Sequence, residues 1–171
     1  MTYPYVLGVD QGGSGSRALI LDTNGAVAGY GYHPVRRIYP QPGWVEQSPA
    51  AIAASVRAAI DTAIIQAGCR ASEIAACGIT TQRDTVFAWD AETGQPIGNA
   101  ITWQDMRTTA LVAEANSWEY AEERRARLGQ FPGAYCSAMH MAWRMRHDQA
   151  FRQAAEAGRL QCSLAAGWLV H

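Results

Sequence analysis

The chain has 171 residues and a formal net charge of -1, with 49% hydrophobic and 17% charged residues. This composition is that of a folded globular chain of about one domain, and it excludes intrinsic disorder, which combines low hydrophobicity with high net charge. The lack of a long basic run disfavours nucleic acid as the main partner, and the lack of any lysine excludes a Walker A phosphate loop and a Schiff-base lysine.

The first 32 residues read as two consecutive β-hairpins. Tyr5–Val9, Arg17–Leu21 and Ala26–Tyr32 are apolar enough for strands, and Asn24-Gly25 is a hairpin signal between the last two. The glycine-rich segment after the first strand therefore leads into another strand. A Rossmann glycine loop leads from a strand into a helix, so this pattern is not a dinucleotide-binding βαβ unit.

A long helix is expected next, followed by further strands and then by several helices. Ser48 suits an N-cap and Pro49 the first helical position, isoleucines and a valine follow at spacing four, and Gly68 suits the C-terminal end. Strands are expected at 74–80 and 85–89, followed by a short apolar stretch at 100–103. A helical pattern runs from 107 to 128 with a break near 116–117, two more helices are expected at 137–147 and 149–157, and a strand is expected within 160–171. This order predicts an α/β fold with a mixed sheet, like the opening of a ribonuclease-H-like, actin-type ATPase domain.

The cysteines and the N-terminus indicate a compartment. Cys69, Cys77, Cys136 and Cys162 show neither CxxC spacing nor a Cys/His cluster with metal-ligand spacing, so buried thiols are expected. The start of the chain lacks the pattern of a signal peptide, and no apolar run is long enough to span a membrane. We therefore expect a cytoplasmic protein without a membrane partner.

The segment from Asp10 to Arg17 carries the first chemical signal. Between these two charges lie three glycines, two serines and one glutamine, namely Gln11, Gly12, Gly13, Ser14, Gly15 and Ser16. Glycines let main-chain N–H groups approach a polyanion, and serines add hydroxyl donors. Asp10 can hold Mg²⁺, directly or through water, and Arg17 can neutralise a transferring phosphoryl group. The alternative is a glycine-rich turn without a ligand, and these residues alone leave both possibilities open.

Four later residues suit a polyhydroxylated ligand. Arg83 can donate to hydroxyl oxygens while Asp84 accepts from hydroxyl hydrogens, although the two could equally form a surface ion pair of little energetic value. Trp103 could form an apolar wall against the carbon face of a polyol, or simply be core. Tyr135 follows Pro132-Gly133 and is either a hydroxyl donor to substrate or an ordinary half-buried tyrosine.

Taken together, four separated stretches resemble the FGGY carbohydrate kinases and, within them, the glycerol kinases. The stretches are GVDQGGSGSRALILD, IYPQPGWVEQSP, CGITTQRDTVFAWDAETGQP and NAITWQDMRTT. They occur in the order and at the spacing of the family, and the resemblance runs from about Tyr5 to Trp168. It implies ATP and Mg²⁺ as cofactors, a small polyol or sugar as substrate, and phosphorylation of a primary hydroxyl of glycerol.

The resemblance also implies roles for single residues. Asp10 corresponds to the aspartate near Mg²⁺ and the phosphates, and Ser14 and Arg17 to a threonine and an arginine of the phosphate loop. Arg83 corresponds to the arginine that binds glycerol hydroxyls, and Asp84 stands where glycerol kinases have a glutamate. Trp103 and Tyr135 complete the substrate set that the resemblance implies.

Departures from the family pattern leave alternatives for the function. Gly13 and Gly15 replace hydroxyl residues, Asp84 is one methylene shorter than glutamate, and Ala166 replaces an aspartate. Family members are also much longer, and their general-base aspartate would lie beyond His171. We therefore expect residues 1–171 to form an incomplete N-terminal kinase domain that is inactive alone, with a homo-oligomer left open as its assembly state. The alternatives are a kinase for erythritol, xylitol or xylulose, or a non-catalytic sugar- or nucleotide-binding fragment.

Overall fold

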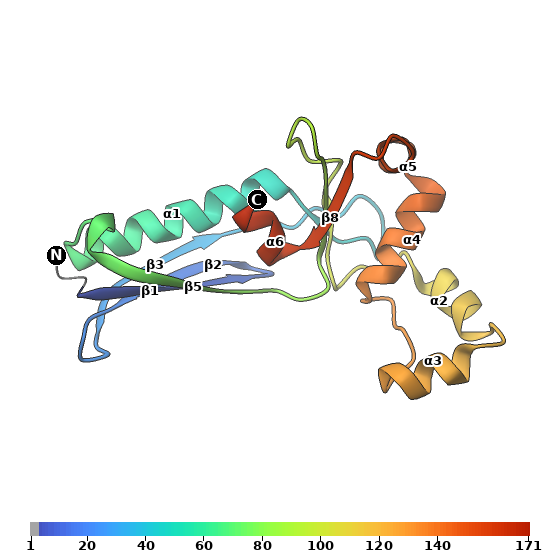
Figure 1. Cartoon of the computed structure of the whole chain (residues 1–171), viewed down its shortest axis with the longest axis horizontal. Coiled ribbons are helices and arrows are strands. Elements are labelled where there is room, and N and C mark those ends of the chain that lie inside the picture. Colours follow the sequence, from blue (N-terminus) through green and yellow to red (C-terminus); the bar gives the residue numbers. More distant parts are fainter. Residues whose placement is uncertain (1–3) are drawn as a thin grey trace. The chain divides into compact units, whose positions relative to one another are not determined.

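The computed structural model describes residues 4–171, and contacts divide this chain into two compact units. We call residues 4–37, 47–82 and 165–171 the hairpin unit, and residues 38–46 and 83–164 the helical unit. The described residues contain two four-stranded sheets, and Figure 1 labels some of the elements of each unit. The prediction that residues 1–171 form one N-terminal kinase domain stays a prediction.

The sheet of the hairpin unit is mixed. It contains β1 (Tyr5–Gly12), β2 (Gly15–Leu21), β3 (Val27–Pro34) and β5 (Ile74–Thr81), in the order β3-β2-β1-β5. The first three strands form the two predicted antiparallel hairpins, while β5 pairs with β1 in parallel. The Asn-Gly turn is confirmed: Asp22 accepts the amides of Asn24 and Ala26, and Gly25 has a φ of 78°.

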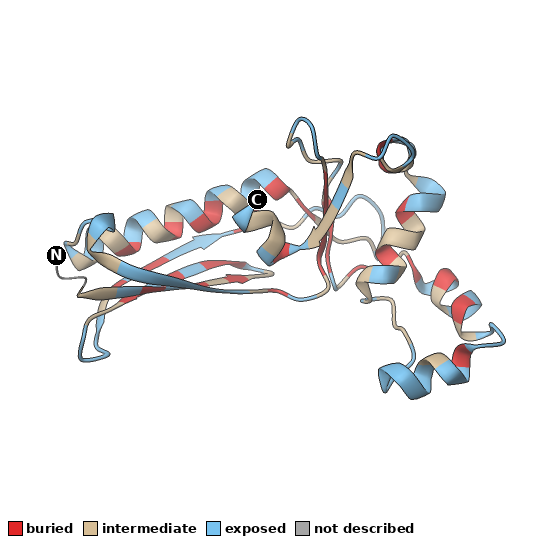
Figure 2. Ribbon diagram, in the orientation of Figure 1, coloured by how far each residue is buried: buried red, intermediate tan, exposed pale blue. Residues whose placement is uncertain are grey.

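One long helix, α1 (Pro49–Ala67), packs against this sheet. Ser48 caps it by accepting the amide of Ala51, and it ends at Gly68 in the left-handed conformation, both as predicted. By length and mean hydropathy alone this helix could cross a membrane, and 22% of that apolar stretch is buried; the residues that are buried pack against the strands. Figure 2 shows the alternation of buried and exposed residues along it. The core consists of Leu7, Val9, Ala18, Ile20, Val56, Ala59 and Ala63.

The alternation of side chains along a strand decides which residues of β1 and β2 face α1. Leu7, Val9 and Ala18 face the helix and are buried, so Asp10 and Arg17 lie on the opposite face. Strand β5 is exposed along most of its length despite its apolar sequence. Cys77 is therefore exposed, and the expectation of a buried thiol is wrong there. The short helices η1 (Ala71–Glu73) and α6 (Ala165–Val170) complete this unit.

The helical unit contains most of the second sheet, in the order β4-β7-β6-β8, and four helices. The strands are β4 (Glu46–Gln47), which crosses the boundary between the units, β6 (Val86–Asp90), β7 (Ala100–Ile101) and β8 (Leu160–Leu164). The helices are α2 (Thr109–Asn116), α3 (Ala121–Leu128), α4 (Ser137–His147) and α5 (Gln149–Glu156). The predicted helices and the break near 116–117 are confirmed.

The end of the chain differs from the prediction. A strand was expected within 160–171, but β8 stops at Leu164 and α6 begins at Ala165. The ladder with β6 ends at the pair Val86–Leu164, and two alanines, the best helix formers, follow. The apolar character of this segment is compatible with either structure, so pairing partners and propensity decided where the strand ended.

Candidate functional site

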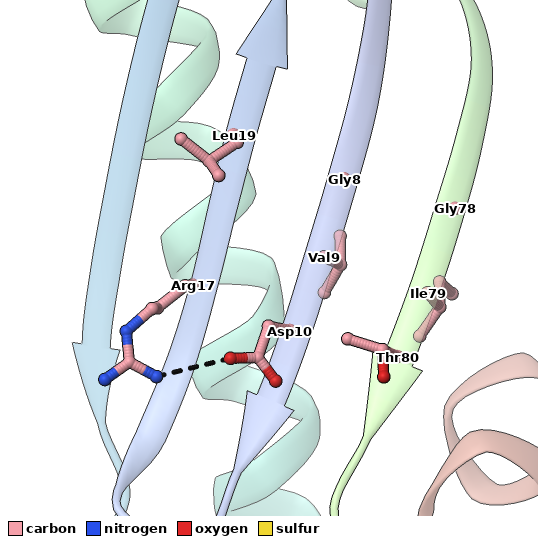
Figure 3. A pocket seen from close by; sticks show the side chains of 8 residues that line it. All are labelled: Gly8, Val9, Asp10, Arg17, Leu19, Gly78, Ile79 and Thr80. Carbon is pink, nitrogen blue, oxygen red and sulfur yellow. Dashed lines mark hydrogen bonds and ion pairs between the residues drawn. The ribbon is translucent and has the colours of Figure 1, made fainter. Parts of the chain in front are cut away.

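The hairpin unit brings the two predicted phosphate-site charges together. Asp10 and Arg17 are cross-strand partners on β1 and β2, and their side chains form an ion pair of 3.3 Å. Figure 3 shows both side chains, which are about half exposed at 49% and 44%. They line a hollow of about 480 Å³ with Thr80 and with residues of β1, β2 and β5. An exposed pair of this kind can exchange its partner for a ligand at little cost.

The turn between β1 and β2 has features that suit an anion. Gly12 pairs with Gly15, so Gly13 and Ser14 form a two-residue turn. The carbonyl of Gly13 accepts from the Gln47 side chain, and that of Ser14 accepts from the amide of Val35 and from a tyrosine hydroxyl. Among residues 4–171, the amides of Gly13 and Ser14 have no acceptor. These N–H groups are therefore available to phosphate oxygens.

Two residues of the predicted loop do not reach this surface. The Ser16 hydroxyl is fully buried and shares a 2.7 Å hydrogen bond with Ser55 of α1. Its predicted role as a hydroxyl donor to phosphate is therefore wrong, because alternation in β2 turns it towards the helix. Gly15 is also buried, and a side chain there would meet the Tyr32 ring and the His33 carbonyl. Its glycine is thus required by packing within the unit rather than by approach to a ligand.

The donor set at Asp10 fits magnesium. Within residues 4–171, no cluster of three or more His, Cys, Asp or Glu side chains could hold a metal through protein ligands alone. Mg²⁺ needs no such cluster, because it keeps several waters and binds through one or two carboxylates together with substrate phosphates. One accessible carboxylate beside free amides is compatible with that mode of binding.

Three buried glutamines support the turn between β1 and β2, and the sequence did not indicate this role for them. Gln82 donates to the side-chain oxygens of Gln11 and Gln47 at 3.1 and 2.9 Å. Gln11 in turn donates to the carbonyl of Gly12, and Gln47 donates to that of Gly13. The three side chains come from distant stretches, so the only available signal was that each sits inside a stretch carrying the family resemblance.

The four predicted substrate residues all belong to the helical unit. Arg83 is exposed and has no ion-pair or hydrogen-bond partner within the described chain. Asp84 is half-buried and accepts a 3.1 Å hydrogen bond from the hydroxyl of Ser137. The two neighbours do not pair with one another, so the reading as a mutual surface ion pair is not supported. Arg83 is therefore a free charged donor next to a carboxylate acceptor.

The two aromatic candidates are accessible rather than core. Trp103 is 48% exposed and Tyr135 is 40% exposed, so both can present a ring to a ligand. The Tyr135 ring lies directly against Gly133, where the structure has no room for a side chain. That contact gives the glycine before this tyrosine a packing role. Because its side chain is exposed, Trp103 is not a core residue of this structure.

The stretches PGWVEQ and WQDMR, which lie far apart in the sequence, are joined by a network of ion pairs and aromatic contacts. Arg107 is buried and pairs with Asp105 at 2.8 Å and with Glu46 at 2.7 Å. Its guanidinium also lies 3.8 Å from the ring centre of Trp44 and 5.0 Å from that of Trp143. The stretches PGWVEQ and WQDMR therefore hold one another in place, and their charged residues are not available to a ligand.

The comparison with known families identifies this architecture. Residues 5–170 match the N-terminal domain of the FGGY family of carbohydrate kinases. Glycerol kinase from Symbiobacterium thermophilum is 41% identical over 170 residues, and glycerol kinase from Aromatoleum aromaticum is 42% identical over 166 residues. The alignments cover 99% and 97% of this chain but 34% of each relative. The chain therefore spans about a third of the length of the curated relatives it matches.

Solved structures agree on the fold. Plasmodium falciparum glycerol kinase, solved with ADP, superposes with a TM-score of 0.86 at 24% identity, covering 97% of this chain and 33% of that one. Xylulose kinase from Rhodospirillum rubrum gives a TM-score of 0.84 at 22% identity, with the same coverage. At these identities the likeness shows the fold alone. The predicted α/β fold with a mixed sheet and N-terminal hairpins is confirmed.

Proposed function

Because the chain belongs to the FGGY family of carbohydrate kinases, we propose that it is the N-terminal third of an enzyme that phosphorylates glycerol with ATP. The reaction transfers the γ-phosphoryl group to a primary hydroxyl and releases ADP. The observation that carries the proposal is the adjacency of an unpaired Arg83 and an accessible Asp84 in the helical unit. A polyol needs such a neighbouring donor and acceptor. The likeness to glycerol kinases favours glycerol among the polyols.

The hairpin unit would hold the phosphates. Arg17 would leave its exposed pair with Asp10 and neutralise phosphate charge, and the free amides of Gly13 and Ser14 would donate to phosphate oxygens. Magnesium bound near Asp10 supplies charge neutralisation at the phosphates. These groups act by position and charge, which is how catalysis of phosphoryl transfer mainly works.

The helical unit would hold the acceptor. Arg83 donates to an acceptor hydroxyl oxygen, Asp84 accepts from a hydroxyl hydrogen, Tyr135 adds a hydroxyl, and Trp103 covers the carbon face. The general base, an aspartate, and the adenosine site would lie outside residues 1–171. The proposal places this enzyme in the cytoplasm, where ATP is supplied, with a small-molecule polyol as its partner.

The first test removes the charged donor in the complete kinase. Arg83→Ala should lower kcat/KM for glycerol, because a charged hydrogen-bond donor is lost. The decrease should correspond to a loss of about 2–4 kcal/mol in transition-state stabilisation. The KM for ATP should stay near the wild-type value. Arg125→Ala is the matched control, since Arg125 is an exposed arginine of the same unit whose guanidinium pairs with Glu122 and lies 5.6 Å from the ring centre of Phe131. Equal losses for both substrates would contradict the acceptor role.

The acceptor itself is decided by comparing wild-type kcat/KM for glycerol, erythritol, xylitol and xylulose. Glycerol is the expected best substrate. An enzyme at least tenfold better on a four- or five-carbon acceptor would keep the kinase class and replace glycerol as the substrate. The shorter side chain of Asp84 is the reason for testing these acceptors.

Residues 1–171 alone, incubated with ATP, Mg²⁺ and glycerol, should form no glycerol phosphate above the blank. Clear turnover abolished by Asp10→Ala would contradict the assignment of the missing groups.

A further inference from the structure

The main chain at Asp84 is in an unusual conformation. With a φ of 56°, Asp84 is the only residue other than glycine with positive φ in the described part of the chain. Side chains rarely tolerate this region, although aspartate and asparagine are enriched there. Such a conformation costs about 1–3 kcal/mol and persists only where the surroundings hold it. The contacts around Asp84 therefore show what fixes it.

Helix α4 contacts both the side chain and the main chain of Asp84. The hydroxyl of Ser137, the first residue of α4, donates to Oδ1 of Asp84 at 3.1 Å, across 53 residues of sequence. One turn later, the fully buried His140 ring lies against the main chain of Asp84 and Ala134, although neither ring nitrogen completes a hydrogen bond of standard geometry. The carboxylate also lies at the N-terminal end of α4, which favours negative charge.

These contacts leave one carboxylate oxygen for a ligand. Oδ1 is taken by Ser137, whereas Oδ2 has no protein partner in the described chain. The side chain of aspartate has two torsions, and a hydrogen bond to one oxygen fixes the direction of the other. Ser137 therefore determines where Oδ2 points, while the left-handed main chain determines where the side chain begins.

We propose that Ser137 is a positioning residue for the acceptor: it aims Oδ2 of Asp84 at a substrate hydroxyl. This inference rests on the proposed function, in which Asp84 accepts a hydrogen bond from the polyol. It also explains why a shorter acid is suitable at this position. Aspartate adopts the left-handed conformation more readily than glutamate, and its short side chain reaches the first turn of α4. Ser137 touches no substrate atom and acts only through Asp84.

The test uses the complete kinase with Ser137→Ala. The KM for glycerol should rise about tenfold, while kcat, the KM for ATP and the midpoint of thermal unfolding stay near wild type, because the change affects only the aim of one acceptor. Ser137→Thr keeps the hydroxyl and should restore the KM. The matched control is Ser117→Ala, which removes a serine hydroxyl of the same unit bonded only to the main chain of Glu114.

A double-mutant cycle with Asp84→Asn separates positioning from a structural role. If Ser137 acts through Asp84, Ser137→Ala should have little further effect on the KM for glycerol in the Asp84→Asn background. Additive effects, an unchanged KM in Ser137→Ala, or equal losses for ATP and glycerol with a lowered thermal midpoint would each overturn the inference while the proposed function stands. A wild-type kinase that phosphorylates no polyol would overturn both.

Discussion

The two units place their functional groups by different means. In the hairpin unit, Asp10 and Arg17 are seven residues apart and meet because one hairpin register makes them cross-strand neighbours. In the helical unit, Asp84 meets Ser137 from 53 residues away, and Arg107 meets Glu46 from 61 residues away. Local hairpin geometry therefore brings Asp10 and Arg17 together, whereas long-range packing brings together the pairs of the helical unit.

The charged pairs of the two units differ in the same way. The pair of Asp10 and Arg17 is half exposed to solvent, so it contributes little to stability. The pairs of Arg107 are almost fully buried and enclosed by two tryptophans. Arg17 and Arg107 are the same residue type and differ in burial. The buried Arg107 has a structural role, whereas the exposed Arg17 has the proposed role at a ligand.

The largest expected effect tests this difference directly. Arg107→Ala should lower the free energy of unfolding by about 3–5 kcal/mol, because it leaves the carboxylates of Asp105 and Glu46 buried without their partner. Arg17→Ala, the matched change in the hairpin unit, should cost at most about 1 kcal/mol. Urea unfolding followed by tryptophan fluorescence measures both, since Trp44 and Trp143 flank Arg107 and Trp168 lies in the hairpin unit. Similar losses in the two variants would contradict the comparison.

A smaller effect is expected from packing within the hairpin unit. Gly31→Ala should destabilise the chain by about 1–3 kcal/mol, because the added carbon would meet the main chain of Ala59 in α1. Gly8→Ala on β1 is the control, since nothing lies within 4 Å of its added carbon. Chemical unfolding of both variants gives the difference. A tolerated Gly31→Ala would mean that α1 does not approach β3 as closely as the structure has it.

The smallest effect concerns pH and the helical unit. Burial lowers the pKa of His140, the charge of Asp105 opposes this, and the charge of Arg107 adds to it. Below about pH 6.5 the unfolded chain then binds a proton at this histidine that the folded chain does not bind. Stability should therefore fall as the pH decreases below 6.5, by at most about 1.4 kcal/mol per pH unit.

The variant His140→Gln isolates this contribution. It should remove that part of the pH dependence, which urea unfolding at pH 5.5, 6.5 and 7.5 would measure against wild type. The expected difference between wild type and variant grows as the pH decreases. An identical dependence in both chains would show that His140 takes up a proton equally in the folded and unfolded states.

Features that depend on neighbouring residues could be predicted well. The cap at Ser48, the turn at Asn24-Gly25 and the end of α1 at Gly68 were anticipated because caps and turns are set by the dihedral preferences and hydrogen bonds of a few adjacent residues. Asp10 and Arg17 were both expected at a phosphate site, but their cross-strand pairing is a finding of the structure. The assignment of Ser16 to the phosphates failed, because which face of β2 is covered depends on where α1 packs.

The sequence by itself determined the hairpins, the long helix, the mixed α/β class and the segments in which the candidate residues lie. Only the tertiary structure decided which candidates are accessible: Trp103 and Tyr135 are exposed, Ser16 is buried, and Arg107 is enclosed by its partners. It also decided the left-handed conformation of Asp84 and the contact with Ser137. The physical reason is range, because local torsional preferences act within a few residues, whereas burial and distant hydrogen bonds exist only once separate elements have packed.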